Sequence, residues 1–192
     1  ILAQAAPQRA FLGPLFLPSA PLAAPPRGAA SWGGRAAAMA RNRLAQELRE
    51  INRNPDPDIT LEMTGDTIEH WQASVRGPKD SPYEGGRFKL KIYCSTAYPL
   101  SPPQVSFETK IFHPNVNFGT GELCLDILKT DWSPAWTLQY VCRAVIALLL
   151  DPNADSPLNC DAGNLIRGGD LRGFRSMARM YTVEHAMDGQ EI

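Results

Sequence analysis

The segment RFKLKIYCS, residues 87–95, alternates apolar and polar side chains over its whole length. Every second residue is apolar, namely Phe88, Leu90, Ile92 and Cys94. The residues between them are polar, namely Arg87, Lys89, Lys91 and Tyr93. Because successive side chains of a strand point to opposite faces, this pattern predicts a strand with one face on a core and one in solvent.

Three further segments, 59–64, 67–77 and 104–109, have strand-like composition and are separated by turn-rich connectors. We therefore expect a four-stranded antiparallel meander. Leu44, Leu48 and Ile51 recur at helical spacing and predict an amphipathic helix over about residues 40–52. A second helix is predicted after Trp136, and a last one after Asp170 as N-cap. In the helix after Trp136, the residues expected to face the core are Leu138, Val141, Cys142, Val145, Leu148 and Leu149. In the last helix they are Leu171, Phe174, Ala178 and Tyr181. The expected fold class is α+β, with helices covering one face of the sheet.

Residues 1–38 have a different composition from the rest of the chain. They contain 12 Ala, 6 Pro, 4 Gly and three Arg, with no Lys, Asp or Glu. Such a segment has little to bury and many prolines, so we expect a disordered head followed by one globular domain over residues 39–192. A translated upstream region, a disordered tail and an organelle transit peptide are the three readings of this head.

Charge and cysteine spacing exclude several classes of function. Removing the three Arg of the head lowers the net charge of the chain from -1 to -4, which does not predict a nucleic-acid surface. The longest apolar run, residues 144–150, is too short to span a bilayer. Cysteines at 94, 124, 142 and 160 match neither a zinc site nor a disulfide framework, which favours a reducing compartment.

The regular pattern stops between Lys110 and Trp136, and a connection of this length is usually functional. It contains HPNVNFGTGELCLDIL, in which Cys124 follows two glycines that permit close approach of another backbone. Asn115, nine residues before Cys124, can donate an amide N–H to a developing oxyanion. Cys94 and Cys142 fall on predicted buried faces, and Cys160 falls in a polar segment predicted to be a turn.

This motif, together with PYEGG, YPLSPP and WSPAW, resembles the catalytic domain of ubiquitin-conjugating enzymes, and the resemblance covers residues 39–187. Within that family, TGELCLDILK, WSPAWTLQYVCRAVIALL and DSPLNCDAGNLIRGGDLRGF are similar to the peroxisomal members, which recycle import receptors. The resemblance implies that Cys124 accepts ubiquitin as a thioester from an activating enzyme. A RING-type ligase would then direct its transfer to a protein, by the narrower resemblance a peroxisomal import receptor.

The resemblance also implies roles for other residues. Asn115 matches the family's asparagine, which stabilises the oxyanion or holds the active-site loop, and both roles remain open. His113 and Pro114 are expected to be structural members of that loop, to which Asp155 and Ser156 also belong. Ligase-facing positions are Leu100, Ser133, Pro134 and Ala135, and the helix that meets the activating enzyme carries Arg41 and Arg43.

The sequence has no phosphate-binding GxxxxGK[ST] loop, so ATP should be used by the upstream activating enzyme. We expect no cofactor and no metal. The expected location is the cytosol, at the cytosolic face of the peroxisomal membrane, with a membrane-anchored recruiter as a further partner. Neither nucleic acid nor direct membrane insertion is expected.

Three positions depart from the family pattern. The spacing from Asn115 to Cys124 is one residue longer than in many members, Leu100 replaces an aromatic residue, and Ser156 replaces a common Asp. Two alternative functions remain: a catalytically silent variant that only binds ubiquitin, and a conjugating enzyme for a ubiquitin-like modifier. The intact motif around Cys124 favours an active enzyme over the first of these.

Overall fold

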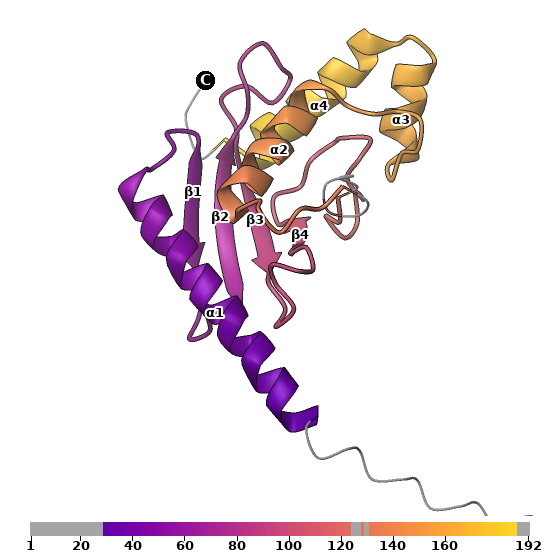
Figure 1. Cartoon of the computed structure of the whole chain (residues 1–192). Helices are drawn as coiled ribbons and strands as arrows, with labels where there is room; N and C mark the ends of the chain where they lie inside the picture. Colours follow the sequence, from indigo (N-terminus) through magenta and orange to yellow (C-terminus); the bar gives the residue numbers. More distant parts are fainter. Residues whose placement is uncertain (1–28, 124–127, 129–130, 188–192) are drawn as a thin grey trace, which may run out of the picture.

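A four-stranded antiparallel sheet forms the centre of the molecule (Figure 1). The computed structural model describes residues 29–123, 128 and 131–187, with side chains from residue 34 onward. Strands β1 (Ile59–Met63), β2 (His70–Arg76), β3 (Arg87–Tyr93) and β4 (Gln104–Phe107) pair in sequence order. The helices are α1 (Ala29–Arg53), α2 (Leu138–Leu150), α3 (Cys160–Arg167) and α4 (Leu171–His185). The predicted α+β meander is confirmed.

The two faces of the sheet differ as the alternation in β3 predicts. Its residues Phe88, Leu90 and Ile92 are buried, and the residues between them are exposed. Across the pair, Val75 lies opposite Phe88 and Ala73 opposite Leu90, so β2 adds its own apolar side chains to the same face. Helix α2 supplies the other side of the core through Leu138, Val141, Cys142, Val145, Ile146 and Leu149. Leu148, expected to be buried, is only partly covered.

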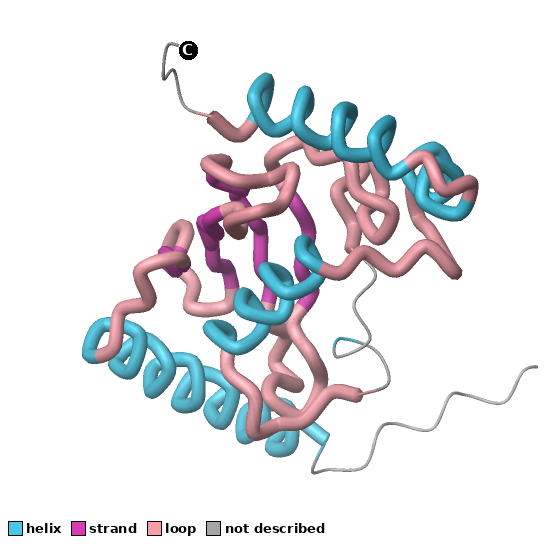
Figure 2. Tube along the Cα trace, turned by 90° about the horizontal axis from the view of Figure 1, so that it is seen from above, coloured by secondary structure: helices cyan, strands magenta, loops and turns pink. Residues whose placement is uncertain are grey.

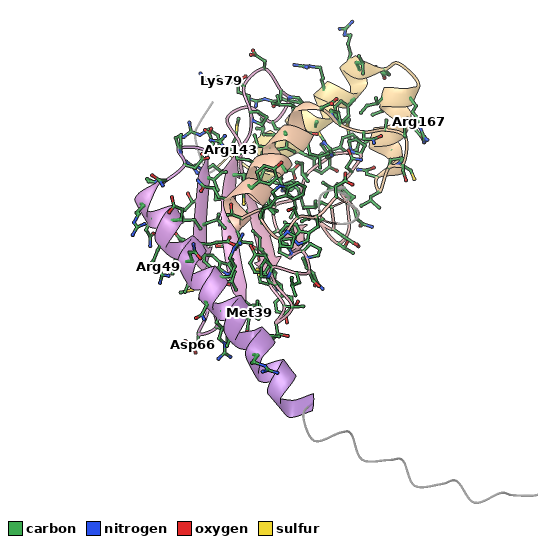
Figure 3. All side chains as sticks on the ribbon, in the orientation of Figure 1. Met39, Arg49, Asp66, Lys79, Arg143 and Arg167 are labelled. Carbon is green, nitrogen blue, oxygen red and sulfur yellow. The ribbon has the colours of Figure 1, made fainter. Side chains whose placement is uncertain are left out.

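Helices α1 and α2 lie on one side of the sheet, whereas α3 and α4 lie towards the other end of the molecule (Figures 1 and 2). Arg143 on α2 binds Asp56 through two hydrogen bonds of 2.7 and 2.6 Å and reaches Asp58 at 3.2 Å. Arg143 is labelled in Figure 3. These contacts fasten α2 to the connector between α1 and β1.

Helix α1 begins at Ala29, eleven residues before the start that the sequence pattern predicted. Residues 29–38, expected to be disordered, are therefore helical. The physical reason is local: the last proline of the head is Pro26, and the alanine-rich segment after it favours helix. From residue 34 to Met39 the side chains are exposed or partly exposed, and Ala40 is the first buried residue. This extension lengthens α1 but contributes no buried side chain from residues 34–39 to the core.

Two other expectations were wrong. Cys160 is the first residue of α3 rather than part of a polar turn, and Asn159 caps that helix by accepting from the N–H groups of Asp161 and Ala162. Leu171 is exposed because it lies in the first turn of α4, beyond the edge of the core that Phe174 reaches. The predicted N-cap of α4 is confirmed, since the Asp170 side chain accepts from Gly173 N–H.

Deleting residues 1–38 should leave the melting temperature unchanged within about 2 °C, because the side chains from 34 to 38 lie outside the core. As a control, deletion through Leu44, which is fully buried, should lower it clearly. Differential scanning calorimetry of the three chains makes the comparison. A loss of several degrees in the shorter deletion would show that the head packs on the domain.

Candidate active site

The segment between β4 and α2 contains the motif HPNVNFGTGELC, and His113 lies in its buried part. The imidazole donates its Nε2–H to the carbonyl of Leu148 at 3.0 Å, and its Nδ1 accepts from Asn115 N–H at 3.1 Å. Burial lowers the pKa of His113 to about 4, although the bond to Leu148 acts in the opposite direction. A neutral ring with both nitrogens engaged favours a structural role over proton transfer.

The side chain of Asn115 joins this segment to the loop that follows α2. Its Nδ2 donates to the carbonyl of Asn153 at 2.7 Å, and its Oδ1 accepts from Asn153 N–H at 2.8 Å. The amide is buried, so these bonds are shielded from water. One of the two amide hydrogens donates to Asn153, and among the described residues the second has no acceptor. The same side chain can therefore hold the loop and stabilise an oxyanion.

Pro114 makes the second link between the two loops. Its carbonyl accepts from Leu158 N–H at 2.8 Å and from Asn159 N–H at 3.0 Å. Both ends of segment 153–158 are thus fixed to residues 114 and 115. Asp155 and Ser156 lie on the short exposed arc between these ties. The structure therefore brings these predicted loop residues together beside Asn115.

A tight turn lies between Asn115 and Cys124. Asn117 Oδ1 accepts from the N–H groups of Gly119 and Thr120, and Asn117 O accepts from Gly121 N–H. Gly121 has a φ of +73°, and a Cβ there would clash with the carbonyl of Phe107.

After this turn two residues form isolated antiparallel bridges. Glu122 pairs with Ser106 of β4, and Leu123 pairs with Val116. The second bridge puts the residue before Cys124 beside the residue after Asn115. Cys124 itself, the predicted nucleophile, lies outside the described residues.

The other three cysteines lie within the described part of the chain. Burial, and then the charge of Glu47, raises the pKa of Cys94 to about 12. Burial, and then the charge of Asp56, raises the pKa of Cys142 to about 12. At neutral pH both are thiols, which are poor nucleophiles. Cys160 is exposed on α3.

The predicted ligase-facing residues come from two loops that are tied together. Leu100 is 72% exposed, and Pro134 and Ala135 are also exposed. Trp132 donates its indole N–H to the carbonyl of Pro99 at 2.8 Å, which fixes the loop of residues 133–135 against the loop of Leu100. The structure therefore brings these residues to one side of the domain.

Sequence reasoning missed Glu47, which joins α1 to both of these loops. Its side chain is 4% exposed. Oε1 accepts from Tyr98 O–H and from Arg43 Nε, each at 2.6 Å, and Oε2 accepts from Leu138 N–H at 2.8 Å. The available signal was its position three residues after Leu44, on the apolar side of the predicted helix.

Arg41 and Arg43 have different environments. The side chain of Arg41 is 67% exposed and lies 4.0 Å from Glu69. That of Arg43 is 24% exposed and donates to Glu47 and, at 2.8 Å, to the carbonyl of Trp136. Arg43 is therefore bound within the domain, whereas Arg41 remains accessible to a partner.

The described residues contain no group of three or more His, Cys, Asp or Glu side chains that could hold a metal ion. Among the described helices, none is both long and apolar enough to cross a membrane.

Acid should destabilise the protein through His113. In the unfolded chain this residue binds a proton near pH 6.5, but in the fold only near pH 4, so its stabilising contribution is present above pH 6.5 and is lost as pH falls through 4. Between pH 7 and pH 5 this loss amounts to roughly 1–2 kcal/mol. In His113→Gln the free energy of unfolding should be lower at pH 7 but should fall less on acidification.

Urea unfolding at the two pH values measures the effect. His70→Gln, which changes an exposed histidine, serves as the control and should keep the pH dependence of the wild type. Equal acid sensitivity in His113→Gln and wild type would contradict the assignment.

Comparison with known proteins places this geometry in a family. The ubiquitin-conjugating enzyme family profile matches residues 43–182. Protein PEROXIN-4 of Arabidopsis thaliana is 60% identical over 149 residues, which cover 77% of this chain and 95% of that protein. Ubiquitin-conjugating enzyme E2 pex4 of Dictyostelium discoideum is 55% identical over 141 residues, covering 73% and 95%.

A solved structure agrees with the sequence matches. The E2 domain of a Toxoplasma gondii ubiquitin-conjugating enzyme superposes with a TM-score of 0.69 at 36% identity, over 76% of this chain and 98% of that domain. The expected fold and enzyme class are thereby confirmed: this chain belongs to the ubiquitin-conjugating enzyme family.

Proposed function

We propose that this chain accepts ubiquitin from an activating enzyme as a thioester on Cys124 and passes it, with a RING-type ligase, to a protein acceptor. The observation that carries the assignment is the bridge between Val116 and Leu123. This bridge places Leu123, the residue before Cys124, beside Val116, the residue after Asn115. The Asn115 amide donates one hydrogen to Asn153, and its second hydrogen has no acceptor among the described residues. The family's partners, ubiquitin, activating enzyme and ligase, follow from membership.

The chemistry needs little beyond the thiol and its surroundings. A thiolate attacks the carbonyl carbon of the incoming thioester, an oxyanion forms, and the activating enzyme's thiolate leaves. One thioester is exchanged for another, so no ATP, metal or cofactor is required on this chain. The second amide hydrogen of Asn115 would donate to the oxyanion. In this proposal His113 supports the loop and carries no proton.

For partner binding, we assign Leu100, Ser133, Pro134 and Ala135 to the ligase and the exposed Arg41 to the activating enzyme. The exposure of Leu100 and Arg41 supports this assignment. Arg43 acts through Glu47 as a positioning residue.

The acyl-transfer assignment predicts a thiol-sensitive ubiquitin adduct on Cys124 alone. The purified chain is incubated with activating enzyme, ATP and ubiquitin and resolved on non-reducing gels. Cys124→Ser should give a thiol-resistant oxyester, because an alkoxide leaves far less readily than a thiolate. Cys160→Ser, which changes an exposed thiol, is the matched control and should charge normally.

An adduct that persists in Cys124→Ala would contradict the assignment. Absence of any adduct on the wild-type chain would support the silent ubiquitin-binding variant. Charging with a ubiquitin-like modifier in preference to ubiquitin would support the other alternative. The same assay therefore separates all three functions.

The relatives named PEROXIN-4 and pex4 support a peroxisomal role. We infer that the chain acts at the cytosolic face of the peroxisomal membrane on an import receptor during its recycling. A membrane-anchored partner would recruit it through a surface away from Cys124, so that the thioester stays accessible. The purified chain should then sediment with intact peroxisomes but not with protein-free liposomes of peroxisomal lipid. Equal binding to both would contradict recruitment by a partner.

Ser156 bears on the choice of acceptor. A lysine amine with a pKa near 10.4 is almost fully protonated at neutral pH, and a carboxylate beside the thioester can position it and take up its proton. A cysteine acceptor reacts as an anion, which a carboxylate repels. Ser156, on the exposed arc tied to Asn115, removes that repulsion. We therefore propose a bias towards thiol or hydroxyl acceptors, although neighbouring Asp155 can also supply a carboxylate.

The substitution Ser156→Asp should speed discharge of the Cys124 thioester to free lysine relative to free cysteine. Ser156→Asn, which has the same shape as the aspartate but no charge, is the control and should leave the ratio near that of wild type. Quenched single-turnover assays measure both rates. An unchanged or reversed ratio in Ser156→Asp would leave Ser156 as an ordinary loop residue.

A further inference from the structure

The turn of residues 117–121, which precedes Cys124, carries an exposed aromatic residue, Phe118. Its ring meets the ring of Tyr181 on α4 edge to face, with the two centroids 5.3 Å apart. This arrangement is attractive because the positive edge of one aromatic ring faces the negative face of the other. A turn otherwise made of Asn, Gly and Thr is thus connected through its apolar residue to the last helix of the domain.

The hydrogen bonds of this turn are local or lie at its end. The N–H groups of Gly119, Thr120 and Gly121 all donate to Asn117. At the end of the turn, the carbonyl of Gly121 accepts from Phe107 N–H at 2.8 Å. A hollow of about 240 Å³ is lined by residues 107–111 and 116–121, so these two segments are not fully packed against each other. The ring contact with α4 therefore adds a support that the turn's own hydrogen bonds do not provide.

Tyr181 also contacts the other end of the segment that carries Asn115. Its ring stacks on Phe112, with centroids 5.9 Å apart and 15° between the ring planes. Phe112 and Phe118 lie three residues before and three residues after Asn115. Phe112 is buried and also contacts Phe174 of α4, with ring centroids 6.3 Å apart. A single side chain of α4 thus contacts both ends of this segment and connects them to the core.

We propose that Tyr181 is a positioning residue for acyl transfer, because it fixes the turn that leads to Cys124 relative to Asn115. The inference rests on the proposed function, in which Asn115 donates to an oxyanion at Cys124. Leu123 pairs with Val116, so a shift of the turn that joins them would change where the reacting carbonyl lies relative to the Asn115 amide. Displacements of about 1 Å in such sites can slow reaction by as much as 10²-fold.

The ring of Tyr181 carries this role rather than its hydroxyl group. Among the described residues, the hydroxyl has no hydrogen-bond partner. The ring contacts Phe112, Phe118 and, within α4, His185. Tyr181→Phe keeps these three contacts, whereas Tyr181→Ala removes them. The two variants therefore separate the ring from the hydroxyl.

Single-turnover discharge of preformed Cys124 thioester, measured over a range of free lysine concentrations, tests the proposal. Tyr181→Ala and Phe118→Ala should each lower the maximal rate about tenfold, while the lysine concentration at half-maximal rate changes by less than about twofold. The double variant should be about as slow as the slower single variant, because both substitutions remove the same contact. Tyr181→Phe should discharge within about twofold of wild type.

Phe174→Leu is the matched control. The Phe174 ring is buried and contacts Phe112 but, among the described residues, no ring of the turn. This control should lower the melting temperature without slowing discharge. Amide hydrogen exchange adds a measurement that does not depend on catalysis. The amides of residues 119–121 should exchange faster in Tyr181→Ala and at the wild-type rate in Phe174→Leu.

Discharge at the wild-type rate in Tyr181→Ala would overturn the proposal. Unchanged exchange at residues 119–121 in that variant would also overturn it, because the turn would then be held without Tyr181. Equal slowing in Tyr181→Ala and Phe174→Leu would indicate a general effect of lost stability and would overturn it as well. Failure of the wild-type chain to charge Cys124 would instead contradict the proposed function and this role together, so the two failures are distinguishable.

Discussion

The buried carboxylate of Glu47 determines how three segments of the molecule sit against one another. A carboxylate removed from water must be paired and hydrogen-bonded, and Glu47 receives bonds from Tyr98, Arg43 and Leu138. These partners belong to the loop after β3, to α1 and to the start of α2. Removing one member of such a buried pair typically costs about 3–5 kcal/mol, so this contact fixes the three segments strongly.

The loops that we assign to a ligase depend on the same arrangement. Arg43, held by Glu47, also donates to the carbonyl of Trp136. Trp132 then donates to Pro99, beside exposed Leu100. A ligase that contacts both loops would therefore meet a preformed surface. The loops around Asn115 are also held by a few specific hydrogen bonds. Side-chain amides and single backbone carbonyls there take the place of the regular hydrogen-bond ladder of a strand pair.

The sequence predicted those parts of the fold whose pattern lies within one element. The alternation of β3 and the apolar period of α2 identify their buried residues, because each follows from local geometry alone. Helix α3 was missed since it spans only eight residues and includes Gly163, which leaves little periodic signal. The early start of α1 was missed because proline content was judged over the whole head, although all of its prolines precede Ala29.

The candidate site was only partly accessible from the sequence for a related reason. The motif identifies Asn115, but its partner Asn153 is 38 positions away, and Glu47 is 91 positions from Leu138. Such pairs appear only when the fold brings the loops together. Ser156 and Asp155 were likewise identified from the motif, whereas the bonds that hold their segment, from Leu158 N–H to Pro114 and from Asn153 N–H to the Asn115 side chain, join loops that are far apart in the sequence.

In the proposed mechanism Asn115 both holds the active-site loop and donates to the oxyanion at Cys124. These roles are measured by single-turnover discharge of preformed thioester to free lysine, compared between wild type and Asn115→Ala. Loss of an oxyanion donor usually slows reaction by about 10²–10³-fold, and we expect a loss of that size in a chain that still folds. Asn159→Ala, which removes the cap of α3 and leaves Asn115 intact, should discharge within about threefold of wild type. Discharge at the wild-type rate in a folded Asn115→Ala protein would contradict the proposed role of Asn115 in transfer.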